Sequence, residues 1–145
     1  MTDITNDLNQ LLADHQVFYQ KCRIYHWTVQ GPLFFALHQK FEELYTEAAL
    51  RVDELAERIV ALGGRPIGTL AKQVSTSRLG EDGEARSAKA MVQNLIDDLE
   101  KLTLWLRETA ADAGEANDSA TLNMLEGFAD ANGKTMWMLR AFLAD

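Results

Sequence analysis

The sequence is poor in residues that cross-link or interrupt a chain. Its 145 residues include one cysteine, two prolines and nine glycines. A single cysteine, Cys22, excludes an intrachain disulfide framework and any zinc site built from several cysteines. So few turn-forming residues argue against disorder and against a β fold with many turns. Long, uninterrupted elements are therefore expected.

Long apolar runs and an excess of positive charge are also missing. No stretch approaches the roughly 18 consecutive apolar residues of a membrane span. The first ten residues lack the basic and apolar character of a signal peptide. Fourteen Lys and Arg against 22 Asp and Glu give a net charge of −8, which does not attract nucleic acid or anionic lipid by bulk electrostatics. These absences predict a single cytoplasmic domain over residues 1–145 with no membrane partner.

The residues that break helices are concentrated in one segment. Five of the nine glycines and one of the two prolines fall within residues 63–83. The rest of the chain shows apolar residues at helical spacing. Four helices are expected, over about residues 5–29, 33–62, 84–113 and from about 117 to the end. Gly31-Pro32 and Gly63-Gly64 mark helix boundaries, with Pro32 suited to the first position of the second helix.

These lengths and connections predict the fold class. Helices of 25 to 30 residues are about 40 Å long. Two short connections and one long one suit an all-α, ferritin-like four-helix bundle with a single crossover. The segment Thr69–Val74 within the crossover is expected to form a short helix.

The histidines do not fit a metal site inside the bundle. Di-iron sites in bundle cores use Glu-x-x-His pairs on facing helices. The residues three positions before His15, His26 and His38 are Leu12, Arg23 and Phe35. A site at the centre of the bundle is therefore not expected, and His15 is interpreted as a core or surface residue.

A different group of metal-binding side chains lies between residues 26 and 57. His26 ends the first predicted helix, and His38 lies early in the second. Glu42 is four residues after His38, and Asp53 and Glu57 have the same spacing, so each pair shares a helix face. Two neutral imidazoles with two or three carboxylates suit iron, manganese or zinc.

The spacing of these residues separates them into two halves. His38 and Asp53 are 15 residues apart on one predicted helix, which is about 22 Å along its axis. They cannot bind the same ion within one chain. Either the two halves are unrelated solvated faces, or the histidines of one subunit meet the carboxylates of another across a two-fold axis.

The same region resembles the signature of a known family. The pattern reads His26-Trp27-x-x-x-Gly31-Pro32-x-Phe34-x-x-x-His38-x-x-Phe41-Glu42-x-x-Tyr45, then Asp53-Glu54-x-Ala56-Glu57-Arg58 and Leu62-Gly63-Gly64. It is similar to the signature of the Dps family, the miniature ferritins or DNA-binding proteins from starved cells. The agreement in helix layout and length extends over essentially the whole chain.

The resemblance implies a specific activity and assembly. Members of the family form hollow shells of twelve subunits, oxidise Fe(II) at two-fold interfaces with hydrogen peroxide as the preferred oxidant, and store the ferric product. The implied metal ligands are His26 and His38 from one subunit, Asp53 and Glu57 from its partner, and Glu42 as a further acid. Trp27 matches a tryptophan beside the iron that donates electrons and limits radical escape. Zinc or manganese would suit the same donors.

Two features depart from the family pattern. In relatives, acids near the start of the last helix line the iron entry pore. Here Ser119 and Asn123 stand where Asp is frequent, so the candidate pore acids are Glu115, Asp118 and Glu126. The chain has no basic residue before Lys21, and a −8 subunit repeated twelve times repels DNA. Chemical protection of DNA is therefore expected rather than coating.

Two alternative functions use the same residues. The first is a non-enzymatic nucleoid-binding protein with a vestigial metal site. The second is a structural helical oligomer in which His26, His38, Asp53 and Glu57 form ion pairs between subunits.

Overall fold

The computed structural model describes residues 3–145, which contain five helices and no strand. The helices are α1 (Ile4–Thr28), α2 (Phe34–Ala61), α3 (Leu70–Thr76), α4 (Ala88–Glu115) and α5 (Ser119–Leu143). The predicted all-α class, the four long helices and the short helix of the crossover are confirmed.

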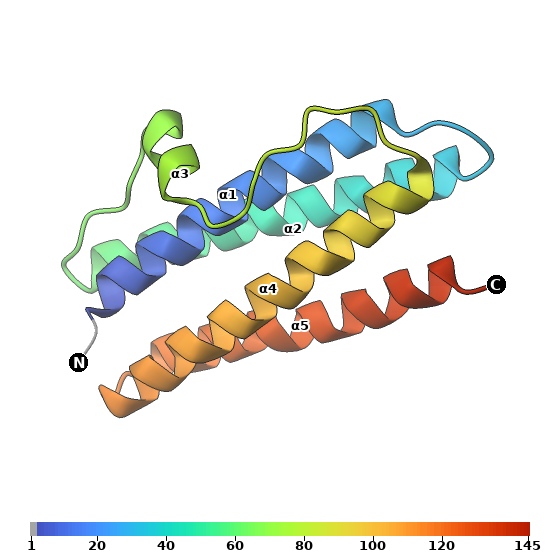
Figure 1. The fold of residues 1–145 in the computed structure, drawn as a ribbon. Helices are drawn as coiled ribbons and strands as arrows, with labels where there is room; N and C mark the ends of the chain where they lie inside the picture. Colours follow the sequence, from blue (N-terminus) through green and yellow to red (C-terminus); the bar gives the residue numbers. More distant parts are fainter. Residues whose placement is uncertain (1–2) are drawn as a thin grey trace.

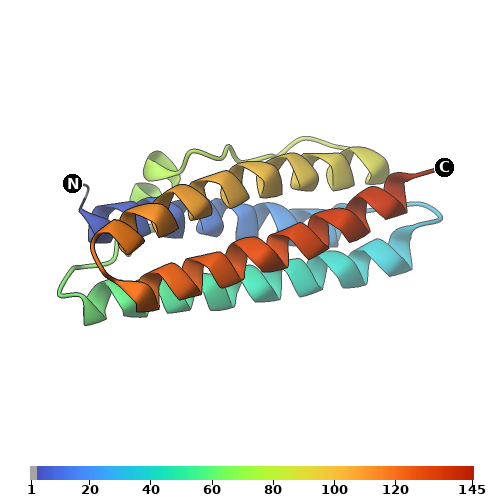
Figure 2. The same ribbon diagram turned by 90° about the horizontal axis from the view of Figure 1, so that it is seen from below.

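The long helices form two antiparallel pairs. Helices α1 and α2 lie side by side, as do α4 and α5, and the two pairs pack into a four-helix bundle (Figures 1 and 2). Helix α2 ends where α1 begins, whereas α4 begins at the other end of the bundle. The crossover between them therefore runs the length of the molecule (Figure 1).

Local sequence explains the ends of the helices. Gly31 and Gly63 adopt φ values of +99° and +86°, which disfavour residues with a Cβ. Helix α4 begins at Ala88, four residues later than the sequence predicts, because the Ser87 hydroxyl caps it by accepting from the Ala90 N–H at 3.2 Å. Helix α2 begins at Phe34, so the prediction that Pro32 opens this helix is wrong.

Apolar side chains fill the space between the four helices. One buried cluster contains Tyr25, Phe41 and Leu95, and a second contains Leu8, Ile59 and Leu125. Each such side chain contributes about 1.5–3 kcal/mol by leaving water. The bundle interior is therefore a packed core, against which helices α1 and α2 lie.

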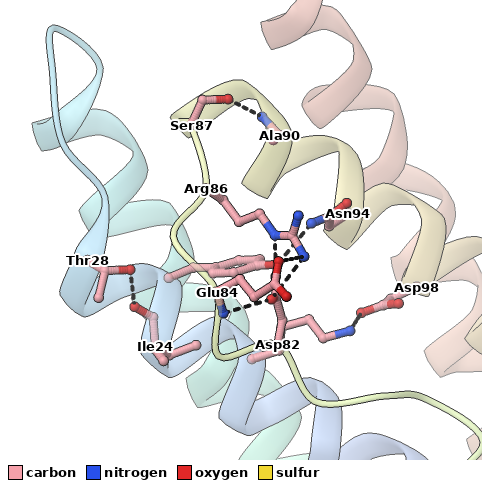
Figure 3. Close-up of polar contacts among 11 residues, drawn as sticks. Ile24, Thr28, Asp82, Glu84, Arg86, Ser87, Ala90, Asn94 and Asp98 are labelled. Carbon is pink, nitrogen blue, oxygen red and sulfur yellow. Dashed lines mark hydrogen bonds and ion pairs between the residues drawn. The ribbon is translucent and has the colours of Figure 1, made fainter.

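The crossover is fixed to the bundle by ionic contacts. Arg78 donates two side-chain hydrogen bonds to Asp14 of α1, at 2.6 and 3.0 Å, and its guanidinium lies 4.0 Å from the centre of the Trp105 ring. Further along, Asp82 accepts hydrogen bonds from Tyr25 and from Arg86 (Figure 3). The Arg86 guanidinium lowers the pKa of Asp82 to about 2, so this contact is charged at neutral pH.

Helix α4 is also tied directly to α1. Lys21 donates to Asp98 at 2.8 Å, and both side chains are almost completely buried. Asn94 donates to the Tyr25 hydroxyl from one turn earlier on α4, next to the Asp82 contact (Figure 3). In the part of the chain that is described, no helix is both long and apolar enough to cross a bilayer.

Candidate metal site

His26 and His38 face each other across the loop that joins α1 to α2. Their rings are stacked, with centroids 3.7 Å apart and planes 13° from parallel. His26 lies in the last turn of α1, and His38 lies in the second turn of α2. The left-handed turn at Gly31 reverses the chain and brings the two rings together.

Each histidine is oriented by the main chain of the other. His26 Nδ1 donates to the carbonyl oxygen of His38 at 2.6 Å, and His38 Nδ1 donates to the carbonyl oxygen of His26 at 2.7 Å. A carbonyl oxygen can only accept, so each Nδ1 carries the hydrogen. In the neutral ring, Nε2 then retains its lone pair. A carbonyl on the second ring nitrogen is one of the common partners of a metal-binding histidine.

Glu42 is the acidic side chain beside this pair. Its Oε1 lies 3.8 Å from His26 Nε2, and it also accepts a hydrogen bond from the Tyr45 hydroxyl at 3.4 Å. The carboxylate is more than half exposed, so it can reorient toward a cation. The structure therefore places three of the predicted ligands near one another, from two helices, without closing them around one point.

Asp53 and Glu57 form a separate pair of exposed carboxyl groups on α2. A hydrogen bond and charge repulsion from Asp53 raise the pKa of Glu57. A cation between the two carboxylates would offset their mutual repulsion, because hard oxygen donors hold divalent cations well. These acids lie about four turns along α2 from His38, as the sequence predicts.

A single subunit does not contain a complete cation site. Among residues 3–145, no three His, Cys, Asp or Glu side chains gather closely enough to hold a metal ion. The histidine pair with Glu42 is one half-site, and Asp53 with Glu57 is the other. We use the names histidine half-site and carboxylate half-site for these two groups.

Three side chains around the histidine half-site were assigned no role from the sequence. The Phe34 ring stacks on His38 with centroids 4.9 Å apart. The Tyr45 ring meets His26 edge-on at 5.3 Å. The Arg23 guanidinium lies 5.0 Å from the centre of the half-exposed Trp27 ring. Arg23 lies four residues before Trp27, a spacing from which the sequence can predict contact.

The remaining candidate residues lie elsewhere. Asp118 caps α5 by accepting from the Thr121 N–H at 3.0 Å and pairs with Arg58 at 2.9 Å, so it is not a free pore acid. Glu115 and Glu126 are exposed. His15 is fully buried in α1 and does not belong to the histidine pair. Burial lowers its pKa to about 4.

Comparisons with known proteins identify the family of the chain. The ferritin-like domain family matches residues 5–145. A protein of Bacillus anthracis named DNA protection during starvation protein 2 is 41% identical over 136 residues, which cover 94% of this chain and 93% of that protein.

The chain belongs to the Dps family of ferritin-like proteins. The crystal structure of Dps from Staphylococcus aureus is 41% identical and superimposes with a TM-score of 0.96, covering 99% of this chain and 96% of that one. Dps from Vibrio cholerae is 38% identical with a TM-score of 0.94, covering 97% and 89%. The latter is described as a member of a superfamily of ferritin-like diiron-carboxylate proteins. The Dps assignment therefore covers the whole bundle, including both half-sites.

Proposed function

We propose that this Dps protein removes Fe(II) and hydrogen peroxide together. Fe(II) is oxidised at sites shared by two subunits, with His26 and His38 from one and Asp53 and Glu57 from the other. Glu42 serves as a further acidic ligand. The ferric product is stored inside a homododecameric cage, in the cytoplasm.

The arrangement of the two half-sites is the observation that carries this proposal. The histidine half-site presents two oriented Nε2 atoms, and the carboxylate half-site carries two oxygen donors about 22 Å away on the same helix. A two-fold axis that pairs the α2 helices in opposite directions brings each half-site of one subunit to the other half-site of its partner. Such a pair has two equivalent sites.

The donor set suits iron as a substrate that changes its oxidation state. Carboxylate oxygens favour Fe(III), whereas imidazole accepts both states. Hydrogen peroxide takes up two electrons, so two Fe(II) ions reduce it fully to water without releasing a hydroxyl radical. When a single Fe(II) is present, an oxidisable side chain near the site, Trp27 among them, supplies the second electron. Zinc and manganese are expected to compete for the same donors.

Protection of DNA follows from this chemistry rather than from coating. Each subunit carries a formal charge of −8, and twelve copies repel a phosphate backbone. Removing both Fe(II) and peroxide protects nearby DNA without direct binding. A nucleoid-binding protein with an inactive metal site predicts the opposite result: a DNA gel shift that survives at physiological salt.

The proposal is tested by combining two inactive variants. One carries His26→Ala and His38→Ala, and the other carries Asp53→Ala and Glu57→Ala. Neither pure cage contains a complete site. Refolding an equal mixture creates two-fold pairs with one intact site of two, so random assortment restores about a quarter of all sites.

Peroxide-driven Fe(II) oxidation, followed by the absorbance of the ferric product, is the readout. The control is the same mixture made from cages that are already assembled, in which subunits do not exchange. Recovery in the refolded mixture alone is the expected result. Inactivity in cages shown to contain both variants would overturn the shared site, and so would activity in either pure variant.

A further inference from the structure

A single arginine lies within an aromatic cluster next to the histidine half-site. The Arg23 guanidinium carbon is 5.0 Å from the centre of the Trp27 ring, 5.1 Å from that of Tyr45 and 5.5 Å from that of Tyr19. Arg23 also donates a hydrogen bond to the Tyr19 hydroxyl at 2.6 Å. One positive charge therefore acts on three oxidisable side chains at once.

Tyr45 connects this cluster to the proposed iron ligands. Its ring lies 5.3 Å from the His26 ring and 5.9 Å from the Tyr19 ring, edge-on in both cases. Its hydroxyl donates to Glu42 Oε1 at 3.4 Å. Tyr45 is therefore in contact with a histidine ligand and has a carboxylate acceptor for its proton.

The three rings do not respond equally to the nearby charge. A guanidinium over an aromatic ring stabilises the neutral ring and opposes positive charge on it. Loss of an electron makes an indole positively charged until its proton leaves. A phenol that passes its proton to a neighbour as the electron leaves remains neutral. Tyr45 has this acceptor in Glu42, whereas the hydroxyl of Tyr19 receives its hydrogen bond from Arg23 itself.

We propose that Arg23 is a positioning residue that makes Tyr45, ahead of Trp27, the side chain that loses an electron at this site. The inference deepens the proposed function and rests on it for its biological purpose. Arg23 does not touch the substrate; it acts by raising the cost of oxidising Trp27 and Tyr19. Trp27 then remains a second donor.

The electron from Tyr45 is needed when peroxide meets a site that holds one Fe(II) ion. The O–O bond of hydrogen peroxide breaks as it takes one electron from Fe(II) and one from Tyr45. The proton of Tyr45 leaves through Glu42 and neutralises one of the two hydroxide ions formed. The products are Fe(III), water, one hydroxide ion and a neutral Tyr45 radical, and no hydroxyl radical is released.

An iron-free oxidation experiment tests the order of the donors without requiring ferroxidase activity. Assembled protein is exposed to a one-electron oxidant generated by light from tris(bipyridine)ruthenium(II) and persulfate. Mass spectrometry of peptides then gives the ratio of Trp27 to Tyr45 oxidation. We expect Tyr45 to be oxidised first in the unmodified protein, and Arg23→Gln to raise the ratio about tenfold.

Two further variants separate the effect of the local charge from its structural role. Arg107→Gln removes the same charge from an exposed position on α4 and should leave the ratio unchanged. Arg23→Lys keeps a charge, but its ammonium lacks the planar surface that lies against three rings. It should raise the ratio by about threefold. If Arg23→Gln does not assemble, Arg23→Lys carries the test. An unchanged ratio in an assembled Arg23 variant would overturn the proposal.

A second arm uses the iron-loaded protein. With less than one Fe(II) per site followed by peroxide, electron paramagnetic resonance of frozen samples should show a tyrosyl signal that disappears in Tyr45→Phe. A signal that persists in Tyr45→Phe would assign the electron to another residue and overturn the proposal. A protein that fails the subunit-mixing experiment but shows the Arg23-dependent ratio would contradict the iron chemistry and leave the order of the donors intact.

Discussion

His26 and His38 each donate a hydrogen bond to the main-chain carbonyl oxygen of the other, at 2.6 and 2.7 Å. The acceptors belong to the backbone, so replacing one side chain removes one ring but leaves the other ring's anchor in place. The two rings can therefore be tested separately.

Replacing His38 should remove iron oxidation without unfolding the protein. His38→Ala deletes one Nε2 donor, while His26 still donates to the main-chain oxygen of residue 38. We expect the initial rate of peroxide-driven Fe(II) oxidation to fall about a hundredfold, with circular dichroism and cage size unchanged. Gln39→Ala, an exposed neighbour, is the matched control. An unchanged rate in His38→Ala would make this histidine a packing residue.

The ring stacked on His38 should tune metal affinity. Phe34→Leu removes an aromatic face that lies nearly parallel to the imidazole, at 4.9 Å. We expect zinc or manganese affinity, measured by calorimetry, to fall about tenfold because the ligand gains rotational freedom. Phe35→Leu makes the same change at a side chain that is 84% exposed and should have little effect. Equal losses in both variants would exclude a specific role for Phe34.

His15 should make the bundle sensitive to acid. Burial lowers its pKa from the ordinary 6.5 to about 4 in the folded protein, with Arg51 nearby adding to the effect. Between these pH values the unfolded chain binds a proton on His15 that the folded chain does not. The free energy of unfolding therefore decreases as the pH falls from about 6.5 to about 4, by about 3 kcal/mol from this residue.

Urea denaturation across this pH range provides the measurement. His15→Gln cannot be protonated, so its stability should depend less steeply on pH than that of the unmodified protein. Above about pH 7 the contribution of protonation is absent, and the difference between the two proteins should be constant there. Parallel curves over the whole range would contradict the prediction.

The Asp14–Arg78 contact should hold the crossover on the bundle. Asp14 has no exposed surface, so Arg78→Ala leaves a buried carboxylate without its ionic partner and should cost about 3–5 kcal/mol in the free energy of unfolding. Arg78→Met combined with Asp14→Asn removes both charges and keeps an apolar side chain over Trp105. The double variant should be more stable than Arg78→Ala. If Arg78→Ala were the more stable of the two, the Asp14–Arg78 ion pair would not be what stabilises this contact.

Much of the architecture can be predicted because periodicity and helix breakers report it directly. Leu37, Phe41 and Leu44 recur on one face of α2 and are buried there. The concentration of glycine around residues 63–83 marks the crossover. The separation of His38 from Asp53 along one helix predicts that a single chain cannot complete the site. Each of these features depends on spacing within one segment.

Contacts between segments account for what the sequence does not predict. His26 and His38 anchor each other through their main-chain carbonyl oxygens. Every residue has such an oxygen, so no residue type in the sequence signals this contact. The late start of α4 depends on the Ser87 cap. The ion pair between Asp118 and Arg58 joins α5 to α2, and no local pattern signals it. Arg23 differs, because its spacing from Tyr19 and Trp27 is visible in the sequence.

The fold places every residue of the proposed chemistry in one half of the chain. Tyr19, Arg23 and the histidine half-site lie on α1 and α2, as does the carboxylate half-site, whereas α4 and α5 contribute none of them. The second hairpin supports the first without taking part in its reaction. The residues that would oxidise iron are therefore inherited together within α1 and α2, which end at Ala61.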